Sequence, residues 1–188
     1  APLKAASGTI IWVSDNKTPS DPADQGWIDL LVAEGYTVDL SFRDWDGAPL
    51  GASEMATLNA ADLVIISRDT ISGAYGDDAA DWNAVTTPII LTAAHIARNN
   101  RWDWLDSSQV NDSEPVLEAV DPSHPVFSGV TLNGGDQVDI LTTLNSFTAT
   151  TSPGSGTLIA RRSDNNQVWI VTWDAGERFY GGSSFTTG

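Results

Sequence analysis

Four of the chain's seven arginines follow segments that are predicted to be β-strands. Arg43, Arg68, Arg98 and Arg101 stand in the loops or first helical turns just beyond those segments. In an open α/β sheet, ligands bind at the edge formed by the carboxyl ends of the strands. A guanidinium group holds a carboxylate or sulfate through two parallel hydrogen bonds. The spacing therefore predicts a pocket for an anionic or polyhydroxylated ligand.

Further polar and aromatic side chains stand in the same predicted loops. They are Asp15, Asn16, Trp45, Asp69, His95, Asn99 and Trp102. Four of them are predicted to bind the ligand together with the four arginines: Asn16, Trp45, Asn99 and Trp102. The alternative interpretation is that the arginines pair with neighbouring Asp residues and hold the loops in place.

His95 is the candidate for general acid–base catalysis, because histidine titrates near neutral pH. Asp15 or Asp69 would be its catalytic partner, and the alternative is a structural role for this histidine. The chain has no cysteine and no G-x-S-x-G sequence, which excludes a Cys nucleophile and a serine-hydrolase elbow. The residues therefore favour ligand binding over turnover.

The sequence Arg101-Trp102-Asp103-Trp104 places two tryptophans two residues apart. On a helix, residues at this spacing do not face the same side. One of the two indoles is therefore expected to be exposed, where it would be a stacking platform for a sugar ring. The alternative is that both tryptophans are anchored in the core.

Asp15, Asp21 and Asp24 place three carboxylates within ten residues. Ca²⁺ takes oxygen ligands, so this loop is a candidate calcium site, although the spacing is not that of an EF-hand. The alternative is a solvated loop, and no other cofactor or metal is predicted. His124 lies between two prolines, where it is expected to fix a turn by hydrogen bonding.

The formal net charge of −16 argues against nucleic acid and anionic membranes as partners. Membrane insertion is not expected, because no apolar run approaches the roughly 18 residues that a spanning helix needs. Little lysine together with abundant Asp, Thr, Ser and Gly is typical of extracellular or cell-surface bacterial proteins. Both ends of the chain have the composition of a module edge, so links to other modules of a larger protein are expected.

Apolar segments alternate with helical segments in the first half of the chain. Strands are predicted at 9–14, 36–42, 62–67 and 88–93, and helices at 27–34, 53–60 and 77–85, with a helical turn at 94–100. The strand segments are apolar without alternation, which predicts burial on both faces, as in a parallel sheet. Further strands are predicted at 138–144, 157–162, 168–173 and 178–180, with a hairpin tip at 164–166.

This pattern predicts a single α/β domain over residues 1–188. The expected architecture is a flavodoxin-like, doubly wound, mostly parallel sheet of strand order 2-1-3-4. A β-rich C-terminal extension is expected to continue the same sheet.

Two segments resemble the ThuA-like (trehalose-utilisation) family of the class I glutamine-amidotransferase-like superfamily. Residues 121–130, Asp-Pro-Ser-His-Pro-Val-Phe-Ser-Gly-Val, are similar to that family's "DPSHPI…G" segment. Residues 168–180, which include Trp169, Trp173, Arg178, Phe179 and Tyr180, are similar to its "W…GkGRVFY" close. The resemblance implies a flavodoxin-like sheet, and His95 would match a family histidine. The amidotransferase Cys is missing near Leu91–His95, and so is the "lGH" histidine after Tyr180.

Three functional hypotheses follow from these observations. The leading one is an extracellular accessory or binding module for carbohydrate, including anionic glycans, without turnover of its own. The second is a ThuA-like carbohydrate-active enzyme that uses His95 with Asp15 or Asp69. The third is a structural spacer domain of a surface protein.

Overall fold

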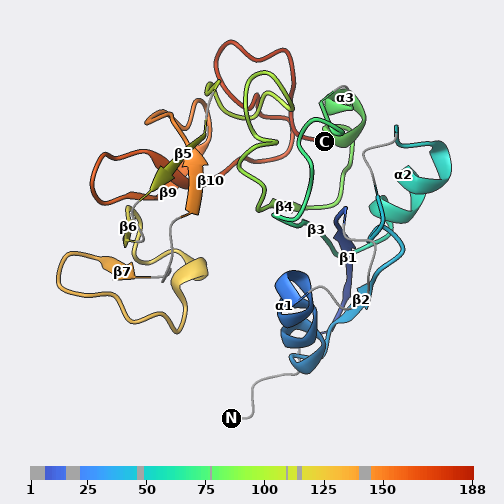
Figure 1. Ribbon diagram of the computed structural model, residues 1–188, viewed down its shortest axis with the longest axis horizontal. Helices are drawn as coiled ribbons and strands as arrows, with labels where there is room; N and C mark the ends of the chain where they lie inside the picture. Colours follow the sequence, from blue (N-terminus) through green and yellow to red (C-terminus); the bar gives the residue numbers. More distant parts are fainter. Residues whose placement is uncertain are drawn as a thin grey trace. The chain divides into compact units, whose positions relative to one another are not determined.

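The computed structural model describes residues 7–15, 22–45, 49–76, 78–108, 110–113, 116–139 and 145–188. The chain divides into two compact units (Figure 1). The first unit runs to Ile96 and includes Gly188, and the second covers Ala97–Thr187. Each unit has its own β-sheet, so each is described by itself.

The first unit contains a four-stranded sheet whose described pairings are all parallel. Its elements are β1 (Thr9–Val13), α1 (Pro22–Ala33), β2 (Thr37–Asp39), α2 (Ala52–Asn59), β3 (Leu63–Ile66), α3 (Ala79–Trp82) and β4 (Ile89–Leu91). The strand order β2-β1-β3-β4 confirms the predicted order 2-1-3-4 and the α/β class of this unit.

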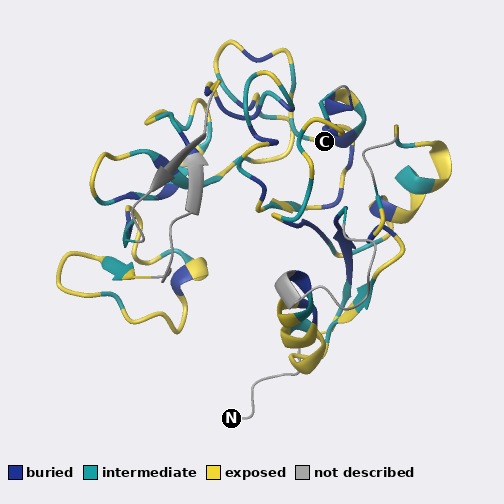
Figure 2. Cartoon of the chain, in the orientation of Figure 1, coloured by how far each residue is buried: buried dark blue, intermediate teal, exposed yellow. Residues whose placement is uncertain are grey.

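The central strands are buried on both faces, as their uninterrupted apolar sequences predict (Figure 2). Ile10, Trp12 and Ile65 form one cluster with Ile28 of α1, so α1 covers this face of the sheet. Because successive side chains of a strand point to opposite faces, Ile11 faces the other way, and it is 1% exposed. Burial on both faces explains why these strands carry no alternating polar residues.

The second unit is built mainly of antiparallel strands. Its elements are β5 (Val110–Ser113), β6 (Val116–Ala119), the 3₁₀ helix η1 (Pro125–Phe127), β7 (Gln137–Asp139), β8 (Asn145–Thr148), β9 (Thr157–Arg162) and β10 (Val168–Thr172). A four-stranded sheet has the order β10-β9-β6-β7, and β5 pairs with β8 in a separate two-stranded sheet. Leu117, Phe127 and Ile159 belong to the core of this unit.

The expectation that the C-terminal strands continue the parallel sheet is wrong. They form sheets of their own, because β6 pairs on both sides with later strands, Leu117 opposite Val138 and Leu117 opposite Arg162. The predicted strand at 178–180 is reduced to an isolated bridge between Arg178 and Thr186. The predicted hairpin tip is confirmed, since β9 and β10 are antiparallel and Asn166 has a φ of 63°.

The helices of the first unit begin and end differently from the predictions. α1 starts earlier than expected, at Pro22, and α3 is shortened to the four residues Ala79–Trp82. The predicted helical segment after β4 contains no helix and consists of turns, a bend and the isolated bridge from Arg98 to Leu105. None of the described helices combines the length and the apolar character required to cross a membrane.

Candidate functional site

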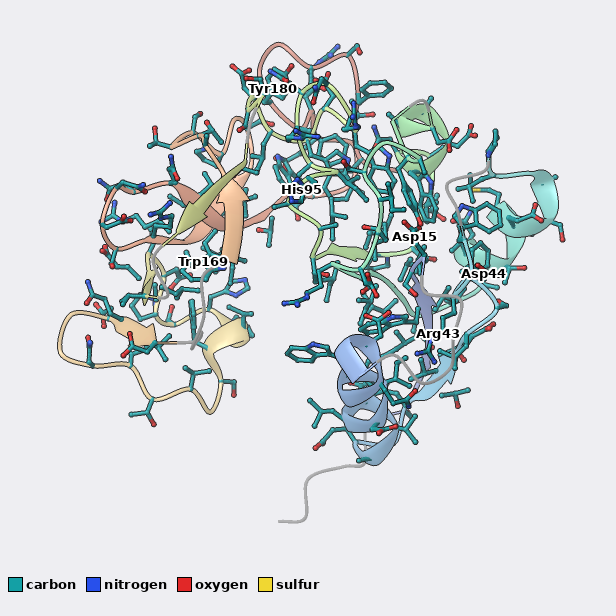
Figure 3. The ribbon with its side chains drawn as sticks, viewed as in Figure 1. Asp15, Arg43, Asp44, His95, Trp169 and Tyr180 are labelled. Carbon is teal, nitrogen blue, oxygen red and sulfur yellow. The ribbon has the colours of Figure 1, made fainter. Side chains whose placement is uncertain are left out.

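The loops after β1, β2 and β3 are tied together at the carboxyl edge of the parallel sheet. The amide of Trp45 donates to the carbonyl of Ser14 (3.1 Å), and the amide of Asp15 donates to the carbonyl of Asp69 (3.1 Å). The Ser14 hydroxyl in turn donates to the carbonyl of Arg43 (3.2 Å). The structure therefore brings together four of the predicted site residues, Asp15, Arg43, Trp45 and Asp69. Figure 3 labels two of them, Asp15 and Arg43.

Asp15 is held by two donors from the segment that follows β3. The hydroxyl of the fully buried Tyr75 lies 3.0 Å from Asp15 Oδ1 and 2.9 Å from the carbonyl oxygen of Trp45. The amide of Ile71 donates to Asp15 Oδ2. Asp15 and Tyr75 together therefore join three loops. The sequence pattern did not point to Tyr75 because it stands well beyond the end of its strand.

Asp24 is a buried carboxylate in the first turn of α1, with 1% of its surface exposed. Its Oδ2 accepts from the indole nitrogen of Trp12 (3.0 Å) and its Oδ1 accepts from the hydroxyl of Ser67 (2.5 Å). The positive end of the helix dipole also favours a carboxylate at this position. The calcium hypothesis had placed Asp24 in a ligand set, whereas here it links α1 to β1 and to the residue after β3.

Arg43 is buried at the same edge, with 6% of its surface exposed. Its Nη1 donates to Gln25 Oε1 at 3.4 Å, which is close to the upper limit for a hydrogen bond. Its Nε and Nη2 are buried and have no acceptor within the described residues, and the same holds for the indole nitrogen of Trp45. Within the described residues, the β2 loop thus contains three buried donor nitrogens without an acceptor.

The remaining first-unit candidates have different environments. Arg68, directly after the buried Ser67, is exposed, and Asp69 is half-buried with its amide donating to Ser67 Oγ (3.0 Å). His95 is exposed in the turn after β4 (Figure 3). Asn16 lies outside the described residues. Of the candidate arginines in this unit, Arg43 is therefore the buried one.

Arg98, Asn99, Arg101 and Trp102 belong to the second unit, in a closed loop. The amide of Leu105 donates to the carbonyl of Ala97 (2.9 Å), which closes this loop at its base. Burial lowers the pKa of Arg98, and the neighbouring positive charge of Arg101 lowers it further. Asn99 Nδ2 donates to Asp106 (3.1 Å), and Arg101 Nη1 donates to the carbonyl of Asn100 (2.8 Å).

The expectation that one indole of the Trp102–Trp104 pair is exposed is wrong. Trp102 is 0% exposed and Trp104 is 8% exposed. The segment forms turns rather than a helix, and Asp103 between the two indoles has a φ of 64°, so the helical spacing argument does not apply. Trp104 stacks on Phe179 with ring centroids 4.6 Å apart. The tryptophans are therefore core anchors, the alternative that the sequence analysis had left open.

Asp103 connects this loop to the segment after β10. The Tyr180 hydroxyl donates to Asp103 Oδ1 (2.8 Å), and the Ser183 hydroxyl lies 3.2 Å from Asp103 Oδ2. Asp103 has a φ of 64°, a backbone conformation that L-residues adopt uncommonly. The hydrogen bond to Asp103, together with burial and the negative charges of Asp103 and Asp106, raises the pKa of Tyr180 to about 12.

The raised pKa of Tyr180 predicts a pH dependence in the alkaline range. The folded pKa of about 12 exceeds the ordinary value of 10.0, so this contribution to stability is complete below pH 10 and is lost as pH rises through 12. A spectrophotometric titration of tyrosinate in the wild type should include a late transition from Tyr180. In Asp103→Asn that transition should move toward 10.0, and an unmoved transition would disprove the assigned cause.

Residues 121–130 form a compact turn. Asp121 Oδ1 accepts from the Ser123 hydroxyl (2.6 Å) and amide (3.1 Å), and these bonds lower the pKa of Asp121. His124 Nδ1 accepts from the amide of Val126 (3.2 Å) and thereby caps η1. The predicted turn-fixing role of His124 is confirmed.

Two other features of the first unit are weaker candidates for a site. No group of three His, Asp or Glu residues suitable for a metal ion occurs in the described ranges, and most of the acidic loop (residues 16–21) lies outside them. A shallow groove of about 470 Å³ lies between α2 and the Ile11 face of the sheet. The carboxylate that lines this groove, Asp39, accepts from the amide of Ser41 (2.8 Å). The carboxyl edge around Arg43 is therefore the better candidate.

Comparisons with known proteins identify no relative: no family model, no curated protein and no solved structure matches the chain.

Proposed function

We propose that this chain is an extracellular accessory or binding module for carbohydrate, without turnover of its own. Its ligand binds at the carboxyl edge of the parallel sheet, where the loops after β1, β2 and β3 meet. The supporting observation is the excess of buried donors at this edge, since Arg43 and Trp45 hold N–H groups without acceptors in the described structure. Sugars are rich in hydroxyl and carboxylate oxygens that accept such hydrogen bonds.

The hydrogen bonds of Asp15, one of the two candidate catalytic partners of His95, favour binding over catalysis by this carboxylate. Both oxygens of Asp15 accept hydrogen bonds from the segment after β3, and both oxygens of Asp24 accept hydrogen bonds from the core. A general base needs a carboxylate that can reach the substrate. These two carboxylates instead fix the loops that carry Arg43 and Trp45. The enzyme hypothesis with His95 predicts product formation, which the experiment below detects.

The extracellular location is part of the proposal and rests on composition. The net charge of −16 keeps the protein soluble in a salty medium, and the absence of cysteine makes its stability independent of redox conditions. The same composition also suits a spacer domain, so composition does not distinguish the two hypotheses. The spacer hypothesis differs in one expected result, since it predicts no ligand.

A glycan-array screen with calorimetry and product analysis on each hit tests this function. We expect retention of at least one sugar class with no change in the sugar. Trp45→Ala should weaken binding about three- to tenfold, because an aromatic contact contributes roughly 0.5–1.5 kcal/mol. Trp27→Ala is the matched control, because this tryptophan of α1 is 59% exposed and lies outside the loops at the carboxyl edge. Cleaved sugar would support the enzyme, and a blank array would support the spacer.

A further inference from the structure

Two arginines of the second unit show how this chain holds carboxylates. Arg162 donates from Nε to Asp164 Oδ1 (2.9 Å) and from Nη2 to Asp164 Oδ2 (2.6 Å). Arg161 uses the same two nitrogens toward Glu118 Oε1, at 3.0 and 2.5 Å. The Nε and Nη2 hydrogens lie on one side of the planar guanidinium, so this edge matches the two oxygens of a carboxylate.

Arg43 presents the same edge without an acceptor. Its Nε and Nη2 are both buried and unpartnered within the described part of the chain, while its Nη1 reaches Gln25 at 3.4 Å. A buried donor that has lost water and gained no acceptor is unfavourable, and more so when the group is charged. The edge of Arg43 is therefore poised to gain a negatively charged acceptor.

Two carboxylates at this edge, one buried and one half-buried, are engaged by other donors. Asp24 accepts from Trp12 and Ser67, and Asp15 accepts from Tyr75 and Ile71. Both are thus committed to holding the loops together. The chain keeps an arginine in a buried position but directs these carboxylates to other donors, which is the arrangement of a site for an external carboxylate.

We propose that the Nε–Nη2 edge of Arg43 is the receptor for a carboxylate group of the ligand. Given the proposed function, on which this inference rests, the ligand class is an acidic sugar of the uronate type. The carboxylate makes two parallel hydrogen bonds with Arg43, as Asp164 does with Arg162. The Gln25 amide, held to Asp29 at 2.7 Å, stays beside Nη1 and leaves the receptor edge to the ligand.

Titration of the protein with D-glucuronate and with D-glucose tests the assignment. The wild type should bind glucuronate at least about tenfold more tightly than glucose, because the neutral sugar cannot form the bidentate, charge-assisted hydrogen bonds with Arg43. Glucuronate should also raise the melting temperature more than glucose at equal concentration. Arg43→Met should lose this preference.

Arg43→Met also separates a ligand receptor from a structural arginine. Methionine has similar length and no donors, so replacing an unsatisfied buried cation by it should leave the melting temperature unchanged or higher. Arg161→Met is the matched control, because Arg161 already holds Glu118 and should keep the glucuronate preference when replaced. A lower melting temperature in Arg43→Met than in Arg161→Met would overturn the proposal.

The two proposals fail in different ways. Equal binding of glucuronate and glucose by the wild type and by Arg43→Met would overturn the carboxylate receptor and leave a carbohydrate-binding module. Absence of binding to both sugars, together with a blank glycan array, would overturn both. Loss of the glucuronate preference in Arg43→Met, with the preference kept in Arg161→Met, supports both proposals.

Discussion

Asp24→Ala is expected to lower the free energy of unfolding by about 2–5 kcal/mol. The substitution leaves two buried donors, the Trp12 indole nitrogen and the Ser67 hydroxyl, without their acceptor. Each unsatisfied buried donor costs about 1–3 kcal/mol. Because Asp24 joins α1 to β1 and to the residue after β3, the loss should also loosen the loops around Arg43.

Urea unfolding followed by tryptophan fluorescence measures this effect. Asp24→Asn should lose about half as much, because its amide oxygen still accepts one of the two hydrogen bonds. Asp29→Ala is the control on the same helix, because Asp29 is exposed and accepts a hydrogen bond from the side-chain amide of Gln25, one turn away. Its expected change is within about 0.5 kcal/mol. Equal stability of Asp24→Ala and Asp29→Ala would refute the account of Asp24.

Phe179→Ala is expected to lower the stability of the second unit by about 3–5 kcal/mol. The ring is 3% exposed, stacks on Trp104 at 4.6 Å and meets Trp173 edge-on at 5.3 Å. Its removal leaves a cavity and ends two aromatic contacts. The near-ultraviolet circular dichroism of the tryptophans should weaken in the same variant.

Thermal unfolding of Phe179→Ala is best compared with Trp27→Ala. Trp27 is larger than Phe179 but 59% exposed, so its replacement should change stability far less. If Phe179→Ala unfolds at the temperature of Trp27→Ala, the aromatic cluster does not stabilise the unit as described.

Much of the parallel sheet was predictable because each of its strands is recognisable from its own short apolar sequence. Strands buried on both faces need apolar residues at every position, and the segments around Ile11 and Val64 meet that condition. Short connections containing helices then require parallel neighbours and limit the possible strand orders. The hairpin tip at Asn166 was likewise predictable, because Asn tolerates positive φ.

The second sheet was not predictable from local pattern, because its pairing is long-range. β6 pairs with β9 through contacts such as Ala119 opposite Ala160, about forty residues along the chain. The sequence of a short strand with alternating burial does not identify the later strand with which it pairs. β9 and β10 were therefore predictable as strands, whereas the sheet that they join was not.

By itself, the sequence determined that an arginine follows β2 and another follows β3, at the edge where parallel strands end. Only the tertiary structure decided between them, burying Arg43 to 6% exposure and leaving Arg68 exposed. The physical reason is that the burial of Arg43 or Arg68 depends on which distant segments of the chain pack against its loop. Asp15, Asp24 and Tyr75 bring the loops and α1 together around the β2 loop, and their partners lie up to 60 residues away in the sequence.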